Sequence, residues 1–269
     1  MLRCLSNVCT HRGNILVNAP CAAKQIRCGY HSRRFDLAGR MTFMPEFGAA
    51  KDFPTPSDDL PRVPFAQWAG LGFASLSPAA PFEDFMRDLH AATGSLALER
   101  MRLDPTRSRD YEVRANWALY VENYLEGFHI PFVHAGLNDV VDYGSYETRV
   151  HRYANVQLAQ AKDGTPAAQY WWVFPNLMLN FYPWGLSLNH VEPLAIDRTR
   201  VRFQSYVLDP ALLETGAGAS LDRVEAEDEA VVHAVQRGVR SRLYGRGRYS
   251  PTRERGVHHF HRLLVEFLA

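Results

Sequence analysis

The sequence predicts an α+β protein in which a small all-β domain precedes a larger domain built on an antiparallel sheet. Short apolar segments separated by Gly and Pro occupy residues 1–78, which is typical of small strands joined by loops. Aromatic and polar residues alternate over residues 146–208, as they do in the strands of a sheet. Helical patterns flank that stretch in the sequence, so we expect helices on one side of the sheet and an interior that can hold a pocket.

The individual elements can be placed in chain order. The segments QIRC, RFDLAG and GLGFASL are candidate strands, whereas residues 47–64 are rich in Pro and Asp and predict a surface loop. A helix is expected from Pro81, because Pro is favoured in a first helical turn. We place the domain boundary just before it, which gives domains 1–78 and 79–269. Further helices are expected at residues 111–134, 221–244 and 252–268.

Composition and charge exclude several classes of protein. The chain has 269 residues, of which 46% are hydrophobic, and this is enough to bury a large core. Thirty Lys and Arg against 29 Asp and Glu leave a formal charge of +1, so no nucleic-acid or membrane partner is expected. The N-terminus lacks the apolar run of a signal peptide, and no stretch approaches roughly 18 uninterrupted apolar residues. We therefore expect a cytoplasmic protein.

The first candidate site lies in the cysteine-containing N-terminal part. All four cysteines occur within the first 28 residues, a clustering that favours metal binding over disulfides in a reducing compartment. Cys9 and His11 form one pair, and Cys28 and His31 form a second. One Cys and one His from each of two loops is the ligand set of a Rieske [2Fe–2S] cluster, in which two thiolates hold one iron and two imidazoles the other. A zinc site with the same four ligands is the alternative.

A second candidate site lies in the segment from Asn123 to His134. On a continuous helix Asn123, Glu126 and His129 are three residues apart and share one face. His134 does not share that face, but Pro131 breaks the helix and allows the chain to turn His134 toward the same metal. Two histidines and one carboxylate form the facial triad of non-haem Fe(II) oxygenases. The alternative is that the histidines are polar core residues or partners of other ligands.

The carboxylate ligand is expected further along the chain. Residues 223–230 open a predicted helix and contain four acids, and acids also collect near helix N-termini because the helix dipole favours them. Spacing alone does not choose among the four. They are Glu225, Glu227, Asp228 and Glu229.

Three segments carry a resemblance to a known family. CTHRGN, CGYHSRRFDLAG and NYLEGFHIPFVH resemble the alpha subunit of Rieske non-haem iron oxygenases, the aromatic-ring-hydroxylating dioxygenase and choline-monooxygenase-like family. The resemblance implies a Rieske domain followed by a helix-grip catalytic domain. It implies that Asp228 is the carboxylate ligand, with Glu225 as second choice, because the family's Asp precedes a Gln-Arg-Gly at the interval seen here before Gln236. The implied metal ligands are Cys9, His11, Cys28 and His31 for the cluster and His129, His134 and Asp228 for the iron.

The resemblance also assigns supporting roles. Glu126 would bridge His129 to the cluster His31 of a neighbouring subunit. The helical spacing of Asn123 from His129 separately predicts that Asn123 is a polar support beside the iron. Asn14 and Tyr30 stand where respiratory Rieske proteins have disulfide-forming cysteines, so Cys4 and Cys21 are expected to be spare thiols. The implied partners are a small-molecule substrate, O₂, a separate NAD(P)H-dependent reductase or ferredoxin, and two further copies of the chain in a homotrimer.

Two features depart from the family pattern. Ser32-Arg33 replaces the more usual Gly-Trp after the second cluster histidine. Cys9 comes only eight residues after the start, whereas the family's Rieske domains have several strands before the first cluster loop, so we expect an N-terminally incomplete Rieske domain.

The expected activity is O₂-dependent hydroxylation or oxidative demethylation of a small organic substrate. The alternative is a truncated, non-catalytic helix-grip module that binds a small molecule, and a pure electron carrier is disfavoured because it would need no second domain. The aromatic run over residues 171–184 is either sheet core or a cage for a quaternary ammonium group. Its members are Trp171, Trp172, Phe174, Phe181, Tyr182 and Trp184.

Overall fold

The computed structural model describes residues 2–269, which form two compact units divided between Phe82 and Glu83. The first unit is built from short strands, as the sequence predicts, and its small core contains Cys9, Cys28 and Phe35. The expected loop at residues 47–64 also holds one turn of 3-10 helix and one short strand. The strands are β1 (Cys4–Leu5), β2 (Ile26–Arg27), β3 (Arg34–Phe35), β4 (Met41–Phe43), β5 (Arg62–Val63), β6 (Phe65–Trp68) and β7 (Leu71–Ala74).

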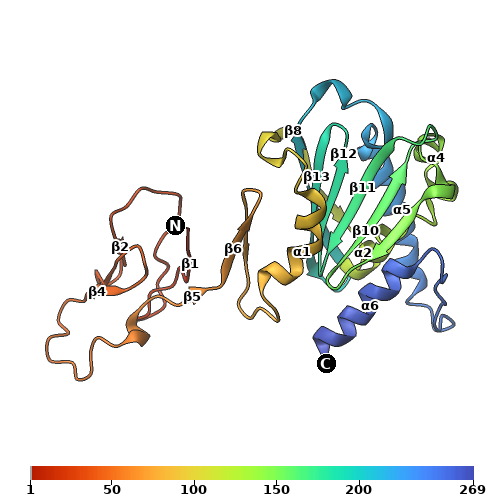
Figure 1. Ribbon diagram of the computed structural model, residues 1–269. Helices are drawn as coiled ribbons and strands as arrows, with labels where there is room; N and C mark the ends of the chain where they lie inside the picture. The colour runs from red at the N-terminus through yellow and green to blue at the C-terminus, as the bar shows by residue number, and fades with distance from the viewer. Residues whose placement is uncertain (1) are drawn as a thin grey trace. The chain divides into compact units, whose positions relative to one another are not determined.

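The second unit contains a seven-stranded antiparallel sheet with the order β8-β14-β13-β12-β11-β10-β9 (Figure 1). Six of its strands lie in the stretch where aromatic and polar residues alternate, which confirms that expectation. The strands are β8 (Arg102–Val113), β9 (Glu147–Val150), β10 (Ala154–Gln160), β11 (Pro166–Val173), β12 (Leu177–Tyr182), β13 (Gly185–Ala195) and β14 (Arg198–Val207).

The prediction of a helix over residues 111–134 was wrong at both ends. Residues 111–113 close the edge strand β8, whose charged residues and Pro105 mask the strand pattern but are typical of sheet edges. The helix α2 (Trp117–Tyr124) starts only after Asn116, whose side chain accepts a hydrogen bond from the N–H of Ala118 at 3.0 Å. It is followed by two short helices, α3 (Ile130–Val133) and α4 (Ala135–Val140).

Two long helices near the C-terminus complete the unit, α5 (Leu221–Gly238) and α6 (Arg255–Leu268). The first was predicted to run to residue 244, but it ends six residues earlier, and the segment after it contains Gly245 and Gly247. Figure 1 shows α2, α5 and α6 on one side of the sheet and α1 (Phe82–Thr93) on the other. Helices therefore lie on both sides, not on one side as predicted. No helix within residues 2–269 is long and apolar enough to cross a membrane.

The sheet face toward α2 and α5 has a polar part and an apolar part. Near its middle, five strands place polar side chains directly opposite one another, and four of these side chains are buried. This polar row consists of Gln157, Tyr170, Asn180, Ser187 and Ser205. Toward the other end of the same face, Trp172, Met178, Val191 and Val201 belong to the main hydrophobic core. The polar row is where the fold leaves room for a site, since buried polar groups need partners.

Candidate metal centres

The two cysteine-containing loops share one backbone arrangement. The N–H of Cys9 donates to the carbonyl of Asn14 at 2.8 Å, and that of Cys28 donates to the carbonyl of Arg33 at 2.8 Å. Each cysteine carbonyl in turn accepts a hydrogen bond from the residue four positions later, Gly13 and Ser32, at 3.0 and 3.1 Å. Both of these later residues have left-handed backbones, with φ of +74° and +59°. The family's usual Gly suits this conformation better than Ser32 does.

The side chains of the two loops converge. Cys9 and Cys28 are both buried, and the rings of His11 and His31 lie 4.8 Å apart between centroids. Nδ1 of His11 is buried and has no hydrogen-bond partner among the described residues, which leaves it available to a metal. Burial, followed by the charge of His31, lowers the pKa of His11 and favours the neutral imidazole that a metal requires. The four predicted ligands therefore fit a Rieske cluster, with two sulfurs and two imidazoles facing one volume.

Hydrogen bonds to sulfur distinguish the two thiols. Burial raises the pKa of Cys9. Burial also acts to raise the pKa of Cys28, but the N–H groups of Tyr30 and His31 outweigh it, so the pKa falls below its ordinary value. The N–H of Tyr30 lies 3.4 Å from this sulfur, and Nδ2 of Asn14 lies 3.7 Å from it. Asn14 and Tyr30, which stand where respiratory Rieske proteins have disulfide-forming cysteines, thus stabilise the thiolate of Cys28. Among the described residues, Cys4 and Cys21 are free thiols, as expected.

A buried ion pair holds the second cluster loop in place. The guanidinium of Arg33 is 2% exposed and bonds the carboxylate of Asp58. Asp58 also accepts the N–H of Thr55 at 2.8 Å, and its backbone carbonyl accepts the hydroxyl of Thr10 at 2.6 Å. Asp58 therefore contacts both cluster loops, the first through Thr10 and the second through Arg33, and holds them in position.

We expect Asp58→Asn to destabilise the cluster-bearing unit by about 3 kcal/mol, because it leaves the Arg33 guanidinium buried without a counter-charge. The measurement is thermal unfolding of the full chain followed by loss of the cluster's visible absorption. The double variant Arg33→Met with Asp58→Asn removes the uncompensated charge and should recover part of the loss. Equal unfolding temperatures for wild type and the single variant would contradict the role of the ion pair.

The second centre forms where α2 ends. The helix stops at Tyr124, so Asn123, Glu126 and His129 do not share one continuous helical face as predicted. Glu126 interrupts the helix because its Oε2 accepts the N–H groups of Phe128 and His129, which a continuing helix would have used. Gly127 packs so closely on the ring of Tyr146 that a Cβ there would lie 2.5 Å from it. Pro131 lies in the first turn of α3 instead of ending α2, and His134 is the C-cap of that short helix.

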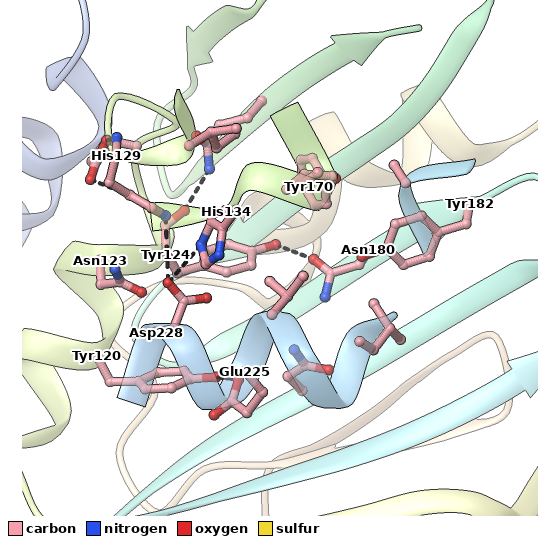
Figure 2. Close-up of a pocket in the computed structure, with 18 of the residues that line it drawn as sticks. Tyr120, Asn123, Tyr124, His129, His134, Tyr170, Asn180, Tyr182, Glu225 and Asp228 are labelled. Carbon is pink, nitrogen blue, oxygen red and sulfur yellow. Dashed lines mark hydrogen bonds and ion pairs between the residues drawn. The ribbon is translucent and has the colours of Figure 1, made fainter. Parts of the chain in front are cut away.

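The two histidines and Asp228 meet in spite of the different backbone path. Nε2 of His134 lies 3.1 Å from Oδ1 of Asp228, and Nε2 of His129 lies 3.5 Å from the same oxygen. The potential ligand atoms of the three residues all lie within 4.8 Å of one another. Figure 2 shows Asp228 reaching up from α5 toward both imidazoles. Two imidazoles and one carboxylate on one side of a cavity fit a mononuclear iron with positions left open for other ligands.

Each histidine is oriented by a second carboxylate. Nδ1 of His129 lies 2.6 Å from Oε1 of Glu126, and Nδ1 of His134 lies 2.8 Å from Oε2 of Glu227. A proton held on Nδ1 leaves the Nε2 lone pair for a metal, which is the usual arrangement around metal-bound histidine. Burial acts to lower the pKa of His134, but Asp228 and Glu227 outweigh it and raise the pKa. The hydrogen bond from His134, and then that from Arg223, lower the pKa of Glu227.

The four acids that were candidates for the carboxylate ligand have different surroundings in the structure. Asp228 faces the histidines, and Glu227 supports His134 from behind. Glu225 is buried and accepts the hydroxyl of Tyr120 at 2.7 Å instead of facing His129 or His134. Glu229 is absent from the residues that line the cavity beside the metal centre. The role of Glu227 was missed, although its position next to Asp228 puts it on the adjacent side of the helix.

A cavity lined by tyrosines and amides opens beside Asp228. Among the residues proposed for an aromatic cage, only Tyr182 lines it, while Trp172 and Phe174 belong to the hydrophobic core. Of the two alternatives for the aromatic run over residues 171–184, the prediction of a cage was therefore wrong. Asn123 lines the cavity, as do Gln157, Asn180 and Asn189. Its tyrosines are Tyr120, Tyr124, Tyr146, Tyr170 and Tyr182.

The cavity tyrosines are linked to the polar row of the sheet. The hydroxyl of Tyr124 donates to Oδ1 of Asn180 at 2.6 Å, and that of Tyr146 donates to Oε1 of Gln157 at 3.1 Å. Burial raises the pKa of Tyr124 and of Tyr146 well above the ordinary value, so both rings stay neutral. The signal that could have located this cavity is the set of amides at inward-facing strand positions.

Comparison with known proteins places this arrangement in a family. Residues 100–269 match the model for the ring hydroxylating alpha subunit (catalytic domain), and residues 1–54 match that for the Rieske [2Fe–2S] domain. The chain is 30% identical to the chloroplastic choline monooxygenase of Arabidopsis thaliana, over 96% of this chain and 67% of that protein. It is also 30% identical to the carnitine monooxygenase oxygenase subunit of Escherichia coli K12, over 99% of this chain and 78% of that subunit.

Solved structures agree with these matches. The quaternary ammonium Rieske monooxygenase CntA in complex with an inhibitor has a TM-score of 0.76 and 25% identity, over 98% of this chain and 77% of that one. A naphthalene 1,2-dioxygenase mutant shares the fold at a TM-score of 0.68 and 16% identity, over 96% of this chain and 77% of that one. The chain therefore belongs to the ring-hydroxylating alpha-subunit family and is a Rieske non-haem iron oxygenase of the choline and carnitine monooxygenase type, with a [2Fe–2S] cluster and a mononuclear iron as its cofactors.

Proposed function

We propose that this protein is the oxygenase component of a monooxygenase that hydroxylates or oxidatively demethylates a small organic substrate. The observation that carries the proposal is the convergence of His129, His134 and Asp228 at the edge of a tyrosine-lined cavity. Relatives are named for choline and carnitine, which supports a small quaternary ammonium compound as substrate. Electrons would come from a separate NAD(P)H-dependent reductase or ferredoxin, as the family implies.

In this proposal His129, His134 and Asp228 hold the iron, which when bound supplies the activation of O₂. The chain's own groups prepare the site for that chemistry. Glu126 and Glu227 keep a proton on Nδ1 of each histidine and thereby fix which nitrogen faces the metal. Tyr124 and Tyr146 are neutral and already hydrogen-bonded to the sheet, so they give the substrate a surface with fixed side-chain positions.

Cys9, His11, Cys28 and His31 hold the cluster in the same proposal. In a homotrimer, Glu126 joins His129 of its own chain to His31 of a neighbouring copy, which gives electrons a short path between the two centres. The 2.6 Å contact between Glu126 and His129 supports the first half of this path. The side chain of Glu126 is 13% exposed, so a carboxylate edge remains for a second partner.

A non-catalytic binding module is the less favoured alternative. Such a module would not need Glu126 and Glu227 to hydrogen-bond the two histidines, and it would not need the four cluster ligands. Both are present here, and polar groups of this kind are costly to bury without a role.

The test is metal analysis combined with turnover. Purified protein should contain iron and acid-labile sulfide, show the visible absorption of a Rieske cluster, and bleach on reduction with dithionite. With a reductase, NADH and O₂ it should convert choline or carnitine to an oxidised product. Colourless protein that binds only zinc would overturn the proposal.

A further inference from the structure

Glu225 is a buried acid with one unused oxygen. Its side chain lies in the wall of the cavity, and the residue is 4% exposed. Oε2 accepts the hydroxyl of Tyr120, whereas Oε1 is buried and has no hydrogen-bond partner within residues 2–269. Figure 2 shows Glu225 and Tyr120 side by side, with Glu225 on the same helix as Asp228. Leaving a carboxyl oxygen buried and unpaired is costly, so a ligand that pairs with it is favoured.

The rest of the cavity wall provides no positive partner for that oxygen. No Lys or Arg is among the described residues that line the cavity, and its other two acids, Glu126 and Asp228, each face a histidine. Burial, assisted by the nearby charges of Asp228 and Glu229, raises the pKa of Glu225 to about 8, although the hydrogen bond from Tyr120 opposes this. Without a ligand the carboxyl group is therefore largely protonated at neutral pH. Tyr120 donates to Glu225, so the carboxyl group is already held as an acceptor.

We propose that Glu225 is a specificity-determining residue that binds the cationic end of the substrate and disfavours substrates that carry a carboxylate. This inference rests on the proposed function, since it concerns the cavity beside the same metal centre. A cation placed near Oε1 favours the ionised form of Glu225, so cation binding releases a proton from this carboxyl group and strengthens as the pH rises through about 8. The faces of the cavity tyrosines add cation–π attraction. A substrate carboxylate would find no guanidinium or ammonium in the cavity wall, and once Glu225 is ionised the two negative charges would repel.

The inference can be tested by binding without turnover. Iron-loaded protein is titrated anaerobically, without reductant, in a calorimeter at about pH 9, where Glu225 is ionised, with choline, with its neutral isostere 3,3-dimethylbutan-1-ol, and with carnitine. Choline should bind at least about tenfold more tightly than the neutral isostere, the size expected for one charge pair at short range, and more tightly than carnitine. In Glu225→Gln, choline affinity should fall by about tenfold or more while the affinity of the neutral isostere stays unchanged.

The controls separate charge from structure. Gln can still accept the hydroxyl of Tyr120, and circular dichroism and iron content should match those of wild type. Glu229→Gln removes the same charge one turn along the helix and outside the cavity lining, so its choline affinity should be unchanged. Choline binding equal to that of the neutral isostere, carnitine binding as tight as choline, or an unaltered Glu225→Gln would overturn the inference. Preserved cation binding in a protein without oxygenase turnover would instead reject the proposed function alone.

Discussion

Replacing Asp228 by Ala is expected to remove the mononuclear iron while leaving the [2Fe–2S] cluster in place. Oδ1 of Asp228 lies 3.1 Å from Nε2 of His134 and 3.5 Å from Nε2 of His129. Two neutral imidazoles alone hold Fe(II) weakly. We expect turnover to fall by more than about 100-fold, since loss of groups that only orient the ligands already costs 10–100-fold. Acid-labile sulfide and the visible spectrum should stay at wild-type levels, and iron per chain should fall by one atom.

Glu229→Ala is the matched control for this prediction, because it shortens the neighbouring acid on the same helix outside the cavity. It should retain full iron content and turnover. Ala is a strong helix former, so neither change should unfold α5. Full iron occupancy in Asp228→Ala would show that another group holds the metal.

The second large effect is expected for Glu126→Gln. The amide keeps the shape of the side chain, but it has a single acceptor oxygen, so it can accept either from Nδ1 of His129 or from the two backbone N–H groups and not from both. It removes the negative charge that joins the two centres in the proposed path. In protein reloaded with iron, both metals should be bound while turnover falls by about 100-fold. The direct measurement is the rate at which a pre-reduced cluster is reoxidised when substrate and O₂ are mixed with the protein in a stopped-flow instrument.

Glu227→Gln provides the comparison, because Glu227 bonds His134 as Glu126 bonds His129. Glu227→Gln should weaken iron binding by about 10–100-fold. Once this variant has been reloaded with iron, its cluster should be reoxidised at the wild-type rate. If both variants slowed reoxidation equally, Glu126 would have only an orienting role.

The convergence of the proposed ligands was the part of the site most predictable from the sequence. Cys9, His11, Cys28 and His31 are close together along the chain, and ligand type alone narrows the choice of metal. The strands over residues 146–208 were also predictable, because a buried sheet imposes a regular alternation of side chains.

The remaining features depend on contacts between distant segments. Strand β8 is an edge strand in which most of the exposed residues are charged, so it lacks the apolar alternation that identifies a central strand. The end of α2 is determined by the side chain of Glu126 and by the packing of Gly127 on Tyr146, neither of which affects helical periodicity. The role of Glu227 depends on His134, which lies 93 residues earlier in the chain.

The polar row across the sheet has a consequence for how this scaffold can change. Its amides and hydroxyls occupy a strip distinct from the packed side chains around Trp172 and Val201, which belong to the main core. Exchanging a residue such as Asn180 for another polar residue alters the inner lining but removes no apolar contact from that core. Variation in substrate preference can therefore accumulate in this strip without loss of core packing, as long as the residue at position 180 still accepts the hydroxyl of Tyr124, whose unpaired burial would cost about 1–3 kcal/mol. Libraries that seek new substrates can target this strip under that condition.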